Sequence, residues 1–202
     1  FPNRVWISGG TLANDVTVSP ETALDAYYLA DNFTVGTDAT LTIEPGTTIK
    51  VLDGRYLQVQ GDLQAVGTAS NPIIFTSTAD TEGNQWAGLY FNGGSGHLNH
   101  AIVRYGGDVF FRGSIQANIY VGAVRTDGEV RIENSRIEGA GTDNDYGYGL
   151  AIDADELHQV TLINNIFNRN FPNRVWISGG RLPNYATVSP QTGLDAYYLA
   201  DN

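Results

Sequence analysis

The densest group of side chains that could bind a metal ion lies between residues 143 and 156. Its five carboxylates are Asp143, Asp145, Asp153, Asp155 and Glu156. Carboxylate oxygens are the ligands that Ca²⁺ prefers, and the first two aspartates stand in an oxygen-rich stretch ending at Gly147, as in the first half of a calcium loop. The twelve-residue spacing of a complete calcium loop is missing. We therefore expect a solvated turn that needs no cofactor, with a Ca²⁺ site as the alternative.

An enzyme acting on polysaccharides would need more than these acids. A Ca²⁺-dependent lyase would add an arginine or lysine as base, and a glycosidase would place two carboxylates around the bond it cleaves. Arg112, Arg125 and Arg131 could face the acids, but nothing in the sequence places them on the same side. The Asp-Asp pair of glycosidases is absent, and the three histidines lack ligand spacing. We expect no catalytic residue, and keep a polysaccharide lyase or hydrolase as the alternative.

The composition excludes several classes of protein. The 11 Lys and Arg residues face 22 Asp and Glu residues, which gives a net charge of −11. This acidity argues against nucleic-acid binding, which needs clustered basic side chains. No uninterrupted apolar stretch is long enough to span a membrane, and the absence of cysteine removes disulfides and thiolate metal sites.

The chain contains a long internal repeat, which indicates how it is organised. Residues 1–32 recur as residues 171–202, and 26 of the 32 positions are identical. The differing positions in the first copy are Thr11, Ala13, Asp15, Val16, Glu21 and Ala23. We interpret residues 1–170 as one repeat unit, 171–202 as the start of the next tandem unit, and the chain as a window of a longer array. Such an array favours reach, adhesion or scaffolding over catalysis at a single site.

The apolar residues of the chain alternate with polar ones in short runs bounded by turn residues, which is typical of strands. A short helical turn is considered only within residues 21–30. Runs at Leu41, Leu57 and Ile73 lie 16 residues apart, and runs at Ile102, Ile132 and Leu162 lie 30 apart. Both spacings favour strands stacked coil upon coil over an antiparallel sandwich, whose hairpins would not produce them.

The corners between such strands also have a signature. Asn134 and Asn164 follow matching apolar pairs, and asparagine tolerates the left-handed backbone conformation of a sharp bend. Amide side chains at such positions could bond to the coils above and below. The same 30-residue phase puts His100 at an inward strand position, where we expect it to be packed or hydrogen-bonded.

Several successive segments resemble a known family. They are LTIEPGTTIKV (41–51), YLQVQGDLQAVGT (56–68), NPIIFTST (71–78), WAGLYF (86–91), LNHAIVRYGG (98–107), VRIENSRIEGA (130–140) and VTLINNIFNRN (160–170). The first five resemble parallel β-helix segments of large secreted and surface-attached bacterial proteins, and the last two resemble coils of the pectate-lyase type. The resemblance implies an all-β, right-handed parallel β-helix with short irregular loops, located outside the cell or on its surface. It does not specify an activity, because this fold carries many functions.

An open β-helix end exposes unpaired strand edges unless something covers it. Because a near-copy of the first segment follows the last coil, we expect units to stack head to tail, either as a tandem chain or as a homopolymer. The predicted junction residues are Phe1, Val5, Trp6 and Ile7 with Phe171, Val175, Trp176 and Ile177. The predicted function is a structural repeat module of an extracellular fibre, stalk or adhesin.

Two further features concern carbohydrate. The three tryptophans and 11 tyrosines could stack on sugars, so a carbohydrate-binding β-helix remains an alternative function and carbohydrate an alternative partner. Asn32-Phe33-Thr34 fits the pattern for N-glycosylation at Asn32. Trp6 and Trp176 occupy the same position of the repeat, for which packing between modules is the expected role.

Overall fold

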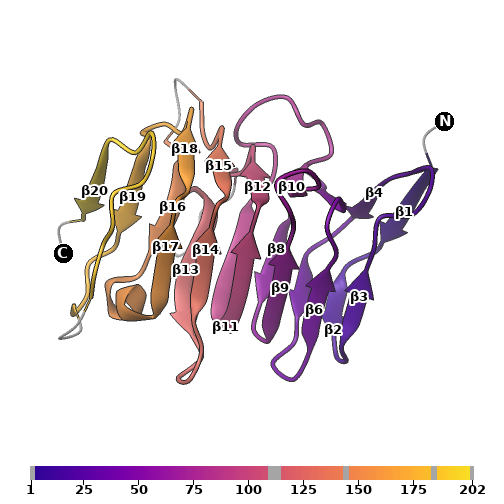
Figure 1. The fold of residues 1–202 in the computed structure, drawn as a ribbon, viewed down its shortest axis with the longest axis horizontal. Coiled ribbons are helices and arrows are strands. Elements are labelled where there is room, and N and C mark those ends of the chain that lie inside the picture. The colour runs from indigo at the N-terminus through magenta and orange to yellow at the C-terminus, as the bar shows by residue number, and fades with distance from the viewer. Residues whose placement is uncertain (1–2, 109–114, 143–145, 183–185, 201–202) are drawn as a thin grey trace.

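The chain folds into a single stack of coils built from short parallel strands (Figure 1). The structure is a computed structural model that describes residues 3–108, 115–142, 146–182 and 186–200. Within these ranges all pairings between named strands are parallel, and the strands wind as a right-handed β-helix. The predicted fold is therefore confirmed, and the antiparallel sandwich is excluded.

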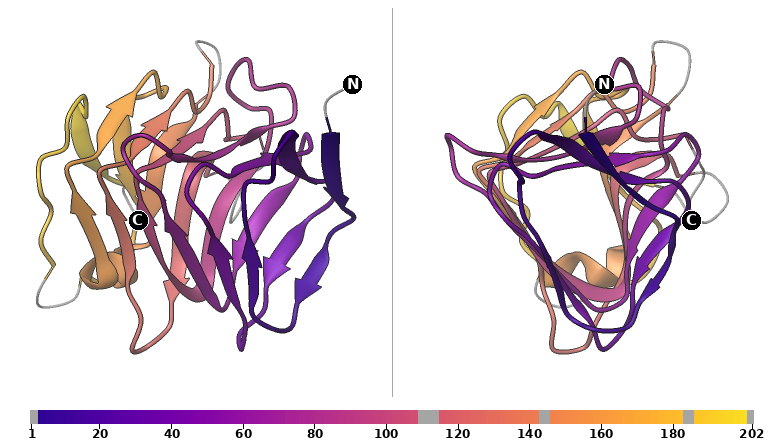
Figure 2. Two further views of the ribbon diagram at one scale, coloured as in Figure 1. Left: turned by 45° about the vertical axis from the view of Figure 1, so that its right-hand side comes forward. Right: turned by 90° about the vertical axis from the view of Figure 1, so that its right-hand side faces the viewer.

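Three sheets run along the β-helix and form its faces (Figure 2). Sheet A contains β1 (Asn3–Ile7), β4 (Leu24–Leu29), β7 (Thr48–Val51), β10 (Ile73–Ser77), β12 (Ala101–Arg104), β15 (Arg136–Glu138) and β18 (Ile166–Asn168). Sheet B contains β2 (Gly10–Leu12), β5 (Phe33–Val35), β8 (Tyr56–Val59), β11 (Gly88–Asn99), β13 (Ala117–Val124), β16 (Tyr148–Ile152), β19 (Arg174–Ile177) and β20 (Ala196–Leu199). Sheet C contains β3 (Val16–Val18), β6 (Thr40–Ile43), β9 (Asp62–Val66), the second half of β11, β14 (Val130–Glu133) and β17 (Val160–Ile163).

The core is a continuous apolar column inside the coils. Alternate residues of each strand point inward, and the parallel register places equivalent residues directly above one another. One such row on sheet B consists of Val35, Val59, Phe91, Val121, Ile152 and Ile177. All six side chains are almost completely buried. Each contributes about 1.5–3 kcal/mol through burial, so every added coil extends the same core.

The register corrects the spacing argument made from the sequence. In sheet C, Leu41 pairs with Leu63 and not with Leu57, so this coil is 22 residues long and 16 residues advance the chain by only two faces. The 30-residue spacing is correct for Ile132 and Leu162, which pair. Ile102 does not belong to that row, because it lies on sheet A and pairs with Arg136.

The corners between sheets C and A adopt the predicted backbone conformation. Asn134 and Asn164 have φ values of 50° and 53°. His100 has a φ of 48° and stands at the same corner one coil earlier, so its predicted inward strand position is wrong. The predicted link between coils exists at Asn134, whose amide donates to Asn99 Oδ1 at 3.1 Å.

The helical content differs from the prediction. Residues 21–30 contain strand β4, whose alternate side chains enter the core. The described helix is instead a 3₁₀ helix, η1 (Ala154–Gln159), in the acidic stretch between β16 and β17. In the described part of the chain, no helix is long and apolar enough to cross a membrane.

Candidate functional site

The second copy of the repeated segment continues the β-helix. Its strand β19 pairs with β16 of the preceding coil on one side and with β20 on the other. Val175 stacks in register on Leu150, and Ile177 on Ile152. Val175 is completely buried and Ile177 is 2% exposed, because both side chains extend the inner column. The second copy of the segment therefore packs directly on the coil that precedes it.

The pairing of β1 with β4 in the first copy matches that of β19 with β20 in the second, but it lies on a different face. Val5 pairs with Tyr27 as Val175 pairs with Tyr197, and the closing hydrogen bond from Ala30 N to Ile7 O has its equivalent in the second copy. However, β1 belongs to sheet A, whereas β19 belongs to sheet B. The chain thus makes six complete turns and advances by one further face between the start of the first copy and the start of the second.

The predicted junction residues differ in burial between the copies. Val5 and Trp6 are 42% and 54% exposed, and Ile7 is half-buried against the core. Phe171 is 39% exposed, and Phe1 lies outside the described residues. The structure thus shows how the second copy contacts the coil before it, while a contact made by the first copy with another unit stays a prediction.

An aromatic strip defines the outer face of sheet B at the junction. Trp176 lies between Tyr148 and Tyr198, with ring centroids 5.0 and 5.1 Å apart. Tyr120, two coils before Trp176, stacks on Tyr90 of the coil before that, with ring centroids 5.1 Å apart and nearly parallel rings. Burial against this strip raises the pKa of Tyr148. The rings of this strip come from five successive coils and lie outside the core, and Trp176 packs the second copy against the coil before it. Its role between modules stays a prediction.

The acidic stretch provides links between coils. Asp153 accepts hydrogen bonds from the hydroxyls of Tyr120 at 2.8 Å and Ser178 at 2.9 Å, and so connects three successive coils. Asp155 accepts the backbone N–H of Arg181, and Glu156 accepts that of Val124. The sequence suggested a turn but gave no indication of these partners, which lie 20 to 35 residues away.

The candidate metal ligands are only partly within the described structure. Asp143 and Asp145 lie outside the described residues. Among the residues that are described, no three His, Asp or Glu side chains form a group able to hold a metal ion. The Ca²⁺ site therefore stays an untested alternative.

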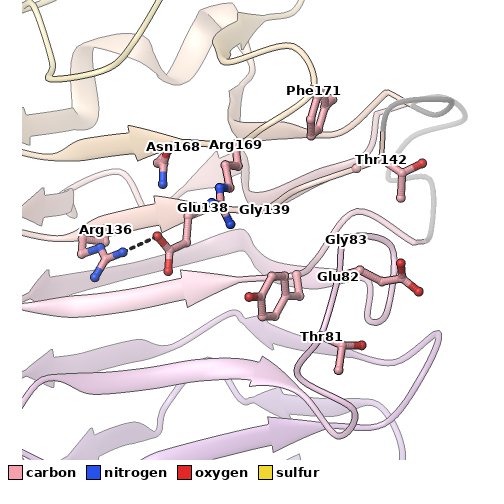
Figure 3. Close-up of a pocket in the computed structure, with 12 residues that line it drawn as sticks. Thr81, Glu82, Gly83, Arg136, Glu138, Gly139, Thr142, Asn168, Arg169 and Phe171 are labelled. Atoms are coloured by element: carbon pink, nitrogen blue, oxygen red, sulfur yellow. Dashed lines mark hydrogen bonds and ion pairs between the residues drawn. The ribbon is translucent and has the colours of Figure 1, made fainter.

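A recess opens where sheet A turns toward sheet B (Figure 3). Its volume is about 450 Å³, and its walls come from the 81–83 loop, Tyr105, and the ends of β15 and β18. Arg136 and Glu138 form an ion pair of 2.6 Å, and Arg169 lies beside them (Figure 3). The recess can offer guanidinium and hydroxyl donors to a polar ligand. Two carboxylates, Glu82 and Glu138, are among its lining residues.

Asn32, the predicted glycosylation site, occupies a corner between β4 and β5. Its side-chain oxygen accepts the backbone N–H of Tyr56 at 3.3 Å, and the residue is half-buried. The amide thus has a structural partner in the next coil. Its glycosylation stays a prediction.

A family profile described as the pectate-lyase-like beta helix domain matches residues 10–148. The chain belongs to this family. The match runs from β2 to the start of β16, so it covers most of the pectate-lyase-like β-helix and ends before the second copy of the repeat. The family defines the fold and leaves the activity open.

Part of this pectate-lyase-like chain is similar to a much longer animal protein. Protein bark beetle of Drosophila melanogaster is 37% identical over 76 residues, which is 37% of this chain and 2% of that protein. The chain therefore corresponds to a small part of a much longer relative. No solved structure matches the chain significantly.

Proposed function

We propose that this chain is a structural repeat module that stacks head to tail in an extracellular or cell-surface fibre, stalk or adhesin. The observation that supports this function is the seating of Val175 and Ile177 on the preceding coil. A second unit begun at residue 171 would continue the same core without a linker. Self-association of this kind is heterologous and open-ended, so it builds a rod instead of a closed particle.

The proposal predicts how the length of an array grows. One unit comprises six turns and one face, and each turn rises about 4.8 Å. Each added unit should therefore lengthen the rod by about 30 Å. We would measure the maximum dimension of chains with one, two and three units by small-angle X-ray scattering and electron microscopy.

A matched control breaks the junction alone. Val175→Asp at each junction places an unpaired charge in the core, which costs several kcal/mol, and should turn the rod into flexibly linked units. Val5→Asp in the first copy should leave the rod intact, because that side chain is 42% exposed. Wild-type arrays whose units tumble independently would contradict the proposal.

The location is a part of the proposal that rests on the likeness to secreted and surface-attached proteins. Antibody labelling of intact cells that produce the protein tests it directly. We expect labelling without permeabilisation. Labelling that appears only after permeabilisation would show that the location is wrong.

The recess at the edge of sheet A supports a second candidate, a carbohydrate-binding or polysaccharide lyase function. Its volume of about 450 Å³ and the guanidinium of Arg169 suit an acidic sugar. We would measure cleavage and binding of acidic polysaccharides with Ca²⁺ and with a chelator. Turnover that Glu82→Gln abolishes would favour an enzyme at the recess, whereas binding that only Arg169→Ala abolishes would favour a binding module.

A further inference from the structure

The two copies of the repeated segment differ where the second copy touches the coil before it. Position 21 of the first copy is an exposed glutamate, and its equivalent is the buried Gln191. Gln191 Oε1 accepts the backbone N–H of Asn165 at 2.9 Å, and Gln191 Nε2 donates to Leu162 O at 3.3 Å. Both partners belong to the last coil of the unit, at the corner between β17 and β18.

Gln191 is the last rung of a buried polar ladder. Ser135 Oγ accepts the N–H of Ala101, Asn165 Oδ1 accepts the N–H of Ser135, and Gln191 Oε1 accepts that of Asn165. A glutamate at position 191 would lose the donor to Leu162 O. It would also place a carboxylate against a carbonyl oxygen in a buried corner, which is unfavourable.

A second difference lies two residues further along. Ala23 and Gly193 share the left-handed backbone conformation, with φ values of 67° and 76°. A Cβ atom on Gly193 would overlap the carbonyl oxygen of Phe167, which is backbone of β18 and cannot move aside easily. Ala23 is exposed and carries its methyl group in the same conformation. The conformation alone therefore does not require glycine, whereas the contact with the preceding coil does.

We propose that Gln191 and Gly193 are the specificity-determining residues of the module junction. A segment that carries the first-copy residues Glu21 and Ala23 cannot pack at the same position on the preceding coil. The partner surface is the end of the unit, formed by Leu162 O, Asn165 N and Phe167 O. This inference rests on the proposed function, because it takes the contact between coils as the contact between modules. Beyond that function, the inference says that the first copy of the segment cannot replace the second copy at the end of the unit.

Hydrogen exchange in the full 202-residue chain tests the inference residue by residue. Gln191→Glu and Gly193→Ala should each accelerate amide exchange in β19 and β20 by at least about tenfold, because the terminal coil opens more often. The matched changes Glu21→Gln and Ala23→Gly should leave exchange in β1 and β4 within about twofold of the parent. Unchanged exchange in β19 and β20 for both second-copy variants would overturn the proposal.

Segment swaps separate these two positions from the other differences. One chain carries the first-copy sequence at all six differing positions of residues 171–202, and a second chain retains Gln191 and Gly193. We expect β19 and β20 to lose protection in the first swap and to keep it in the second. Equal behaviour of the two swaps would assign the fit to other positions and refute the proposal.

Two readouts keep the possible failures apart. Protection of β8, β11 and β13 reports whether the rest of the chain remains folded in every variant. The growth of arrays by about 30 Å per unit tests the proposed function independently. Arrays that lengthen normally while both swaps stay protected would overturn only the role of Gln191 and Gly193.

Discussion

Replacing Val175 with alanine should loosen the second copy of the repeated segment much more than Val5→Ala loosens the first. The two valines occupy the same repeat position and pair with equivalent tyrosines. They differ in their contacts on the side opposite the tyrosine. Val175 also stacks on Leu150 and is completely buried, whereas Val5 is 42% exposed.

The magnitude follows from burial. Valine to alanine removes two methyl-sized groups, each worth about 0.8 kcal/mol when fully buried. The cavity left at Val175 adds to this, which gives a loss of about 2–3 kcal/mol. At Val5 the surface already in contact with water reduces the loss to below about 1 kcal/mol. The difference between the two variants should thus be at least about 1 kcal/mol.

Amide exchange measured by NMR gives the opening free energy of each strand directly. The amide of Trp176 should exchange about tenfold or more faster in Val175→Ala than in the parent. The amide of Trp6 should change only a few-fold in Val5→Ala. Equal losses of opening free energy in the two copies would show that the contact with the preceding coil does not stabilise the second copy. That result would refute the reasoning behind the junction.

Three further predictions concern stability. Asn165→Ala should cost about 3 kcal/mol in urea unfolding, because it leaves two buried backbone groups without partners; a loss below about 1 kcal/mol would contradict the ladder. A hydrogen bond from Arg131 lowers the pKa of Glu133 in the folded protein. The ionised Glu133 side chain therefore stabilises the fold fully above the ordinary pKa of 4.5, and this stabilisation is lost as the pH falls through the lower folded-state pKa. Glu133→Gln should therefore lower the Tm at neutral pH and flatten the acid limb of a Tm–pH profile, which a parallel downward shift would disprove. Burial, together with the charge of Asp53, raises the pKa of Asp108. The ionised Asp108 side chain therefore destabilises the fold above that raised pKa. Asp108→Asn should raise the Tm at pH 7 and have no such effect below about pH 3.8.

The fold could be predicted because its signals are local. Alternation within three to five residues indicates strands, and left-handed asparagines such as Asn134 and Asn164 indicate sharp corners. The lengths of the coils could not be predicted equally well. Turns of different length separate the faces, so a spacing of 16 residues from Leu41 to Leu57 does not identify which strands pair.

The contact of the second copy with the coil before it was predicted only in outline. Repetition of Val5 as Val175 indicated a packing role, which the structure shows for the second copy. The meaning of Gln191 and Gly193 could not be inferred, because their partners in the preceding coil are not marked by any motif. The links made by Asp153 were missed for the same reason: a carboxylate that bonds to hydroxyls in two other coils looks like a solvated turn in the sequence.

The displacement of the second copy from sheet A to sheet B has a consequence for anything carried on the outside of the molecule. If the following unit repeats the first, its recess, its aromatic strip and its acidic stretch all point about a third of a circle away from their predecessors, and every third unit presents them in the original direction again. A flat surface lying along the rod would then meet equivalent groups only once in three units, roughly every 90 Å. A flexible partner that follows the spiral could touch them all.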